Sequence, residues 1–342
     1  MEKNNDPFVE SHFAKEDLTF DVPLRPQLFE DFVGQDEICQ RLEVLIGAAK
    51  QRSEVLGHCL LSGPPGLGKT TLANIIARMM QSSIVVTSGP MLEKPSDLAG
   101  ILTNLQKGDV LFIDEIHRMH RTSEEYLYPA MEDFVLDLMI DSGPSARSVQ
   151  VKLNQFTLIG ATTRSGLITA PMRSRFAFNC RLDYYTPEVL EKILARTAKI
   201  LDFEIDQLGL QEISKRARGT PRIANHLLKW VRDFAQMRSG GSADQKVVND
   251  ALSMIAVDHR GLDEMDKKVL EVIIDHYNGG PVGLNTLAVA IGEERHTIEE
   301  VYEPFLILQG FLKRTPRGRM ATALAYQHLG RELMQENQKT LF

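Results

Sequence analysis

The sequence predicts an α/β protein with a P-loop parallel-sheet domain, a small helical lid domain and a C-terminal winged-helix domain. Three observations lead to this class. Short apolar stretches alternate with helical patterns in the first half of the chain, as in a parallel sheet covered by helices on both faces. The next segment is helical. The last shows a short helix, a turn, a long helix and a basic hairpin. We place the domains at residues 1–184, 185–256 and 257–342.

The composition is that of a globular protein in solution. Its 342 residues, 43% hydrophobic and 25% charged, can build two or three domain cores. The amino terminus is polar, unlike a secretory signal, and no stretch approaches the roughly 20 apolar residues of a membrane span. The three cysteines are far apart, which argues against disulfides or zinc and favours the cytoplasm. Because the net charge is −7, nucleic-acid binding would need a local basic patch.

The elements of the first domain follow in chain order. After a polar tail at residues 1–20, apolar spacing predicts a helix from Asp36 to about Lys50. Apolar runs predict buried strands at residues 84–86, 109–115 and 154–163. In parallel sheets ligands bind at the carboxyl ends of the strands, so residues at these ends are the first candidates for a site.

A phosphate-binding loop is the strongest motif. The stretch from His58 to Ala73 predicts a short strand, a glycine-rich turn and the start of a helix. Within it Gly63, Gly68, Lys69 and Thr70 match G-x-x-x-x-G-K-[ST]. Glycines let the backbone N–H groups approach a triphosphate, and the helix N-terminus adds its positive dipole end. The lysine then reaches the β- and γ-phosphates, and the threonine hydroxyl ligates Mg²⁺. The motif predicts ATP binding.

Two later strands end in polar side chains. Asp114 can hold Mg²⁺ through its water shell, and Glu115 is placed to polarise the attacking water. Thr163 can bond the γ-phosphate or the water. Each has a simpler interpretation, since acids often cap the next helix and hydroxyls often cap a turn.

Three arginines are candidates for stabilising phosphate charge. Arg173 and Arg175 lie in a segment with apolar flanks, and Arg222 opens a helix of the small domain. A planar, permanently charged guanidinium suits a γ-phosphate whose charge redistributes in the transition state. The alternative for each is a surface ion pair.

The two C-terminal domains contain mostly helical patterns. The lid segment predicts helices at 187–201 and 223–237, a turn at 239–242, and no strand. The last segment predicts helices at 262–277, 284–291 and 295–309, then strands at 311–314 and 319–322. This order is typical of a winged helix-turn-helix, and the alternative is a helical protein-binding domain with a hairpin.

Residues 135–153 predict another hairpin. Two alternating stretches flank a turn at 142–144, and Val149 and Val151 point to one apolar face. That face could pack on its own domain or dock a partner. Nearby, His117 and His120 could suggest a metal site, but without a further ligand cluster they favour the surface of a helix.

Seven ordered motifs resemble the RuvB family of bacterial Holliday-junction branch-migration motors, in the AAA+ class. They are GPPGLGKTTLA, FIDEIHRM, YPAMEDF, GATTRSG, MRSRF, GTPRIAN and RTPRGRMAT, within residues 20–330. The sequence departs from the usual finger pattern at Ser174 and Ala177, where an acid and a glycine commonly stand. The resemblance implies an ATP-hydrolysing homohexameric ring that drives duplex DNA past a four-way junction, in recombination, DNA repair and the SOS response. It also implies two partners, the junction-binding RuvA and the resolving nuclease RuvC.

The resemblance also implies residue roles. Thr163 looks like the first sensor, Arg175 like an arginine finger given to a neighbouring subunit, and Arg222 like the second sensor. The catalytic set would be Lys69, Asp114, Glu115, Thr163, Arg175 and Arg222. The ATP or ADP contacts would be Leu24, Arg25, Gly66, Gly68, Lys69, Thr70, Thr71, Glu132, Asp133, Phe134, Arg175, Tyr185 and Arg222. Thr70 and Asp114 would hold Mg²⁺; Arg295, Arg314 and Arg319 would contact DNA; Val149 and Val151 would dock RuvA.

Two rival functions are compatible with parts of this pattern. One is an ATP-dependent DNA-binding switch, against which Glu115 and Arg175 argue, since a switch needs no water activator or finger. The other is a clamp-loading or protein-remodelling AAA+ machine, which the basic winged-helix segment disfavours.

Overall fold

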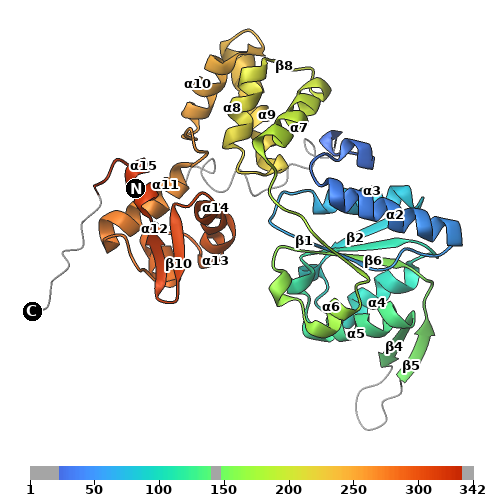
Figure 1. Ribbon diagram of the computed structural model, residues 1–342. Helices are drawn as coiled ribbons and strands as arrows, with labels where there is room; N and C mark the ends of the chain where they lie inside the picture. Colours follow the sequence, from blue (N-terminus) through green and yellow to red (C-terminus); the bar gives the residue numbers. More distant parts are fainter. Residues whose placement is uncertain (1–22, 140–147, 333–342) are drawn as a thin grey trace, which may run out of the picture. The chain divides into compact units, whose positions relative to one another are not determined.

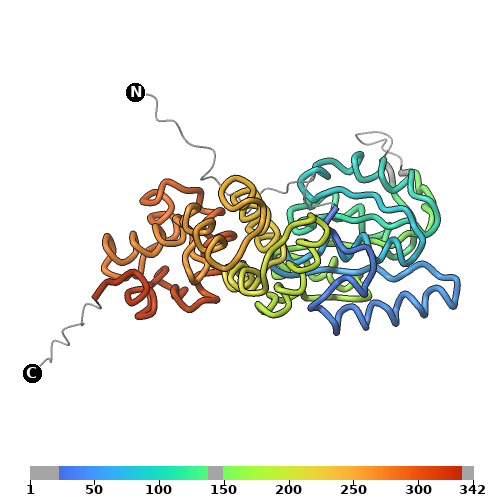
Figure 2. The backbone as a smooth tube through the Cα atoms, turned by 90° about the horizontal axis from the view of Figure 1, so that it is seen from above, coloured from blue at the N-terminus to red at the C-terminus, as the bar shows by residue number. Residues whose placement is uncertain are grey.

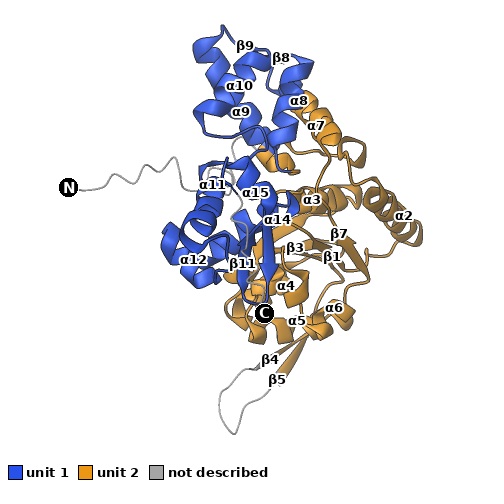
Figure 3. Cartoon of the chain, turned by 60° about the vertical axis from the view of Figure 1, so that its left-hand side comes forward, with its two compact units in different colours: residues 1–16, 198–218, 224–342 blue, residues 17–197, 219–223 orange. Residues whose placement is uncertain are grey.

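The computed structural model describes residues 23–139 and 148–332 (Figure 1). These residues form two compact units (Figure 3). The sheet unit holds the described residues up to 197 and also 219–223, and the helical unit holds 198–218 and 224–332. Each unit has its own hydrophobic core. No helix in the described part of the chain is long and apolar enough to cross a membrane.

Five parallel strands form the centre of the sheet unit, in the order β2-β3-β6-β1-β7. They are β1 (Cys59–Ser62), β2 (Ile84–Ser88), β3 (Val110–Asp114), β6 (Thr157–Thr162) and β7 (Phe178–Arg181). The predicted parallel sheet is confirmed, because every neighbouring pair runs parallel. The sequence did not reveal β7, an edge strand with one buried residue, because it lacks the apolar run of a central strand.

Helices cover both faces of the sheet (Figure 1). One face carries α2 (Asp36–Arg52) and α3 (Lys69–Met79), and Figure 2 shows α2 as the long blue helix on the outside of this unit. The other face carries α4 (Pro95–Asn104), α5 (Arg121–Glu132) and α6 (Ala170–Ser174). The core on that side contains fully buried leucines from α4, α5, β3 and β6. Short 3₁₀ turns, η1 (Phe29–Asp31), η2 (Gly89–Met91), η3 (Ile116–Arg118) and η4 (Ser165–Leu167), complete the unit.

The predicted hairpin consists of β4 (Val135–Met139) and β5 (Ser148–Lys152), which pair antiparallel. Its predicted turn at 142–144 lies outside the described residues. The buried Leu136 is opposite Val151, and Asp137 is opposite Gln150, which donates a hydrogen bond to it at 3.2 Å. Val149 is 43% exposed. The hairpin therefore packs on its own domain through Leu136 and exposes the apolar side chain of Val149.

The lid segment contains α7 (Pro187–Ile200), α8 (Gln207–Arg216), α9 (Pro221–Arg238) and α10 (Gln245–Met254). The prediction that it has no strand is wrong. Two short strands, β8 (Glu204–Ile205) and β9 (Ser242–Ala243), pair parallel, and β9 begins inside the predicted turn. A strand of two residues cannot show the alternation by which strands are predicted from sequence.

The C-terminal part of the helical unit is a winged helix. Its helices are α11 (Glu264–Glu271), the π-helical η5 (Val272–His276), α12 (Leu284–Ile291), α13 (Arg295–Thr297), the π-helical η6 (Ile298–Tyr302), α14 (Glu303–Leu308) and α15 (Ala323–His328). The predicted basic hairpin is β10 (Leu312–Thr315) with β11 (Gly318–Ala321). Fully buried Leu270, Ile273, Leu306 and Phe311 contribute to one core. The predicted helix at 295–309 forms, but as three successive segments.

Candidate nucleotide-binding and hydrolysis site

The glycine-rich loop leaves the carboxyl end of β1 in a conformation that requires glycine. Gly63, Gly66 and Gly68 have φ angles of 140°, 78° and 98°, which side chains rarely adopt. A Cβ on Gly63 would collide with the Leu182 carbonyl, and one on Gly68 would collide with the Phe32 ring. The sequence of the loop therefore dictates its shape before any ligand binds.

Lys69 begins α3 and points back into the loop. Its Nζ donates hydrogen bonds to the carbonyl oxygens of Gly63 at 2.8 Å and Pro64 at 2.9 Å. Burial lowers the pKa of Lys69, while the nearby Glu115 and Asp114 carboxylates act in the opposite direction. The ammonium is held by neutral acceptors, so its charge remains available to a phosphate group.

The ends of three neighbouring strands converge at this loop. Gly63 donates its N–H to the Thr162 carbonyl at 3.1 Å, which joins the end of β1 to the end of β6. Thr163 follows and donates its hydroxyl to Glu115 Oε2 at 3.1 Å, after β3. Asp114 Oδ1 accepts the Glu115 N–H at 2.9 Å. The loop, the acid pair and the threonine, predicted separately, therefore meet at one edge of the sheet.

The oxygen atoms at this edge fit Mg²⁺ rather than a transition metal. Thr70 lies half-buried in the first turn of α3, where Thr71 is buried behind it, and Asp114 ends β3. No group of three or more His, Cys, Asp or Glu that could hold a metal is present among the described residues. Mg²⁺ commonly takes only one or two protein carboxylates, with water and phosphate oxygens completing its octahedron.

Residues from distant segments pack against the same loop. Arg222, at the start of α9, donates its backbone N–H to the Gly66 carbonyl at 3.4 Å. Tyr185 is buried and donates its hydroxyl to the Leu67 carbonyl at 3.1 Å, and burial raises its pKa. Leu24 is also buried, and its carbonyl accepts a hydrogen bond from Arg196. The structure thus brings Arg222 and Tyr185 to the loop.

Arg175 belongs to a different cluster. Its guanidinium donates to Glu132 Oε2 at 2.9 Å and to the Pro171 carbonyl at 2.7 Å, and it lies 4.5 Å from the centre of the Tyr128 ring. Phe134 packs edge-on against Phe156. Among the described residues no hydrogen bond joins Arg175 or Glu132 to the loop. Arg175, Glu132, Asp133 and Phe134 thus lie together at the C-terminal end of α5 and beside it.

His117 is the residue whose position was predicted wrongly. Its side chain is 4% exposed, so it does not lie on a helix surface, whereas His120 is exposed. His117 Nδ1 lies 2.9 Å from Thr162 Oγ1 and 3.2 Å from Glu115 Oε2. The separation of three residues between His117 and His120 does not show which way each side chain points. The 3₁₀ turn η3 directs a side chain two residues after the acid pair back to β6.

The predicted DNA contacts differ in accessibility. Arg295 is exposed at the start of α13. Arg314 on β10 has a side chain 58% exposed and donates to Glu299 at 3.1 Å. Arg319 on β11 is 8% exposed and donates to Glu303 Oε2 at 3.1 and 2.8 Å. Arg314 and Arg319 are therefore paired with carboxylates within the domain.

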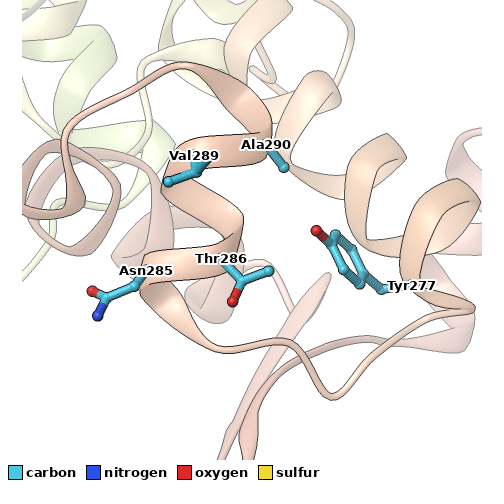
Figure 4. Close-up of a pocket in the computed structure, with 5 residues that line it drawn as sticks. All are labelled: Tyr277, Asn285, Thr286, Val289 and Ala290. Carbon is cyan, nitrogen blue, oxygen red and sulfur yellow. The ribbon is translucent and has the colours of Figure 1, made fainter.

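The winged helix also has a pocket between Tyr277 and α12. Figure 4 shows the Tyr277 ring facing the side of α12 that carries Thr286. The pocket is lined by Tyr277, Asn285, Thr286, Val289 and Ala290. None of these residues was predicted to bind nucleotide or DNA.

Family models match nearly the whole chain. Residues 24–182 match the P-loop domain of the Holliday junction DNA helicase RuvB. Residues 185–258 match the RuvB AAA lid domain, and residues 259–330 match the RuvB C-terminal winged helix domain.

Curated relatives and solved structures agree with these matches. The chain is 67% identical to the Holliday junction branch migration complex subunit RuvB of Protochlamydia amoebophila, over 96% of this chain and 98% of the relative. It is 57% identical to the same subunit of Flavobacterium johnsoniae, over 97% of each. The solved structure of the Thermotoga maritima RuvB Holliday junction branch migration motor superposes with a TM-score of 0.83 at 49% identity. That match covers 91% of this chain and 100% of the other.

Proposed function

The chain belongs to the RuvB family of P-loop AAA+ ATPases, whose role is ATP-driven branch migration of Holliday junctions; from this premise we propose how its own residues perform the work. The observation that carries the proposal is the meeting of the loop, the acid pair and Thr163 at the ends of β1, β3 and β6. A site that only senses nucleotide needs the phosphate-binding loop. It does not need a carboxylate in position to polarise an attacking water.

The hydrolysis site works by positioning and charge. The loop N–H groups and the α3 N-terminus bind the phosphates, and Lys69 exchanges its two carbonyl partners for β- and γ-phosphate oxygens. Glu115 polarises the water that attacks the γ-phosphate, and Thr163 positions the phosphate or that water. Thr70 and Asp114 would hold Mg²⁺, which neutralises phosphate charge when it is bound.

We propose that the Arg175 cluster serves the nucleotide of a neighbouring subunit. Arg175, Glu132, Asp133 and Phe134 were all predicted as nucleotide contacts, yet Arg175 and Glu132 pair with each other rather than with the loop. A homohexameric ring would bring this cluster to the next site, with Arg175 as the arginine finger. Arg222 would sense the same subunit's nucleotide, and its place at the start of α9 would couple hydrolysis to rotation of the lid domain against the sheet domain.

The remaining parts of the proposal concern DNA and partners. Arg295, Arg314 and Arg319 would hold duplex DNA through its phosphates, because a motor that slides needs contacts without base readout. The exposed Val149, with Val151, would dock the junction-binding protein RuvA, and the resolving nuclease RuvC would act on the same junction. The free, buried cysteines Cys39, Cys59 and Cys180 support a cytoplasmic setting.

Two substitutions test the nucleotide site. Glu115→Gln should bind ATP with Mg²⁺ as the unaltered protein does but hydrolyse it about 10²-fold more slowly or worse, because the water loses its general base. Lys69→Ala should weaken binding itself. Both are measured by nucleotide titration and steady-state turnover. If the glutamine variant lost as much affinity as the alanine variant, these roles would be wrong.

Branch migration of a synthetic four-way junction tests the whole function. The protein with ATP should move the junction, and purified RuvA should increase the rate. ATP hydrolysis without migration, both with and without RuvA, would favour the rival interpretations of a switch or a remodelling machine.

A further inference from the structure

We propose that His117 is a positioning residue for ATP hydrolysis, holding the Glu115 carboxylate in the pose from which it polarises water. The inference rests on the proposed role of Glu115. His117 lies in η3, directly after the acid pair, and its side chain is 4% exposed. Its Nδ1 lies between Thr162 Oγ1, at 2.9 Å, and Glu115 Oε2, at 3.2 Å. A buried ring between a strand end and the general base can fix that base.

The surroundings indicate where the Nδ1 proton lies. A bare Nδ1 lone pair facing a carboxylate oxygen at 3.2 Å would be repelled by it. Thr162 Oγ1 also accepts the N–H of Arg164 at 3.0 Å, and a hydroxyl oxygen has a second lone pair for Nδ1–H. The Nδ1–H tautomer therefore satisfies both neighbours, with the hydroxyl as the hydrogen-bond acceptor and the carboxylate attracted by the same proton.

The backbone of Glu115 is held in an unusual conformation. Its φ and ψ angles are 46° and 45°, in the left-handed region that non-glycine residues rarely adopt. Asp114 Oδ1 accepts its N–H at 2.9 Å, and its carbonyl accepts the Arg118 N–H at 2.8 Å. A Cβ on Gly89 would collide with that carbonyl, so the glycine leaves room for it. The structure thus fixes where the Glu115 side chain begins, but not where its carboxylate ends.

Two groups hold Oε2 of the carboxylate: the Thr163 hydroxyl through a hydrogen bond, and the His117 Nδ1–H through electrostatic attraction from 3.2 Å. A bound triphosphate should affect them differently. Thr163 donates its hydroxyl to the same Oε2 at 3.1 Å. That hydroxyl is also the proposed γ-phosphate contact, so a bound triphosphate competes for it. The buried His117 ring is not one of the proposed phosphate contacts, so it would keep Oε2 in place when Thr163 turns to phosphate. Oε1 is then left to accept the proton of the attacking water.

The test compares two substitutions in the full-length protein. His117→Asn places an amide N–H where the Nδ1–H was, and His117→Leu fills similar space without a donor. We expect the leucine variant to lose about tenfold or more in kcat, a part of the 10²–10⁴-fold contribution of a general base. KM for ATP and nucleotide affinity should stay within about twofold, and the asparagine variant should recover most of kcat.

A third variant separates positioning from folding. His117→Gln carries its amide at the position of Nε2, so it should not rescue kcat even where its melting temperature equals that of the asparagine variant. If the leucine variant does not fold, this comparison of two amides still decides. Equal kcat in the asparagine and glutamine variants would overturn the proposal.

Combination with Glu115→Gln shows whether His117 acts through Glu115. The double variant His117→Leu, Glu115→Gln should be no slower than Glu115→Gln alone, because the group that His117 positions is already absent. Additive losses would overturn the inference. If Glu115→Gln itself kept full turnover, the proposed function of Glu115 would fail instead. Slow Glu115→Gln with unimpaired His117→Leu would reject His117 alone.

Discussion

Lys69 in the sheet unit and Arg319 in the helical unit are both buried cations that were predicted to contact phosphate, but their partners differ. The Lys69 ammonium donates to two neutral backbone carbonyls, those of Gly63 and Pro64. The Arg319 guanidinium donates twice to the carboxylate of Glu303. The same contrast extends to Arg314, whose nearest acid is Glu299 at 3.1 Å.

The partner of each cation determines how much positive charge it offers a phosphate. A carbonyl satisfies the hydrogen bonds of an ammonium and leaves its net charge in place. A carboxylate cancels the charge and repels a phosphate, by about 4 kcal/mol at 4 Å with an effective dielectric constant near 20. We therefore expect Lys69 to attract a phosphate group more strongly than Arg314 or Arg319 does. If these two arginines contact DNA as proposed, their partly neutralised charges would suit a surface that must release DNA as it moves.

Arg175 is an exception, since it lies in the sheet unit but is paired with a carboxylate. If it is a finger, it must exchange Glu132 for a neighbouring subunit's γ-phosphate. Arg175→Ala should then reduce turnover by about 10³-fold or more, measured as steady-state ATP hydrolysis. Mixing it with Glu115→Gln protein should restore part of the activity, since some interfaces would join an intact finger to an intact base. Full turnover by monomeric Arg175→Ala would refute the role.

The β4–β5 hairpin differs from both phosphate sites, because its proposed contact with a partner uses no charge. Val149→Asp with Val151→Asp should abolish the stimulation of branch migration by RuvA, while basal ATP hydrolysis and DNA binding persist. The valines lie on one face of β5, and neither belongs to the nucleotide site or the wing. Migration assays with and without RuvA measure the effect.

A control must show that the substituted protein still folds. Val151 is opposite the buried Leu136, so a charge there could cost several kcal/mol if the pair packs tightly. Val149→Asp alone, at the 43% exposed position, is the matched variant. Circular dichroism with a thermal melt shows whether the fold is kept, and a collapsed melting temperature in the single variant would end the docking interpretation.

The local parts of the nucleotide site could be predicted from sequence because they depend on residue chemistry at fixed spacing. Gly63 and Gly68 are required by backbone conformation, and the motif requires a lysine at the position of Lys69. The acids after β3 were placed correctly at a strand end for the same reason. A strand, a tight turn and a helix start leave little freedom to the residues between them.

Pairings between distant residues could not be predicted. Arg218 is four positions before Arg222 and belongs to no predicted site, yet it is buried and contacts Asp263 and Asp266 at 2.7 Å each. Its guanidinium also lies 4.7 Å from the centre of the Phe305 ring. His117 and Arg319 likewise owe their surroundings to other elements. Only the folded structure shows which cations are neutralised.

Substitutions at Arg314 and Glu299 in the wing should change DNA binding by a moderate amount. Arg314→Ala should weaken DNA binding about tenfold and reduce the magnitude of the salt slope by about 0.9, equally for all sequences. Glu299→Gln should act in the opposite direction, because the partly exposed Arg314 would lose the nearer of its two carboxylate neighbours and keep only Glu303, at 3.8 Å. Titration of duplex DNA between about 50 and about 200 mM salt measures both. A change of sequence preference without a change of slope would instead favour a regulator.

The last and smallest effect concerns stability, which should depend on pH differently in the two units. In the sheet unit, His58 Nδ1 accepts the Leu158 N–H at 2.8 Å and Nε2 lies 3.0 Å from the Met131 carbonyl, so the ring is neutral. Burial lowers the pKa of His58. The unfolded chain takes up a proton near pH 6.5 that the folded unit refuses, so acid destabilises the unit below about pH 6.5, by at most about 1.4 kcal/mol per pH unit.

The helical unit should respond in the opposite sense. Burial, aided by the Asp263 carboxylate, raises the pKa of Asp266 to about 7 against the attraction of Arg218. The folded unit then retains a proton that the unfolded chain releases near pH 4, so its stability rises as the pH falls from about 7 towards 5.

Hydrogen exchange of β6 and α11 amides, at about pH 5.5 and about pH 7.5, separates the two responses once rates are converted to opening free energies. The opening free energy of β6 should fall in acid, and that of α11 should rise. His58→Gln and Asp266→Asn are the matched controls, because each removes one titrating group and should flatten the trend in its own unit alone. If both units lost stability in acid, the two carboxylates that contact Arg218, those of Asp263 and Asp266, would both be ionised at neutral pH. Arg218 would then be neutralised by full negative charges, like Arg319, and not by a pair that shares a proton.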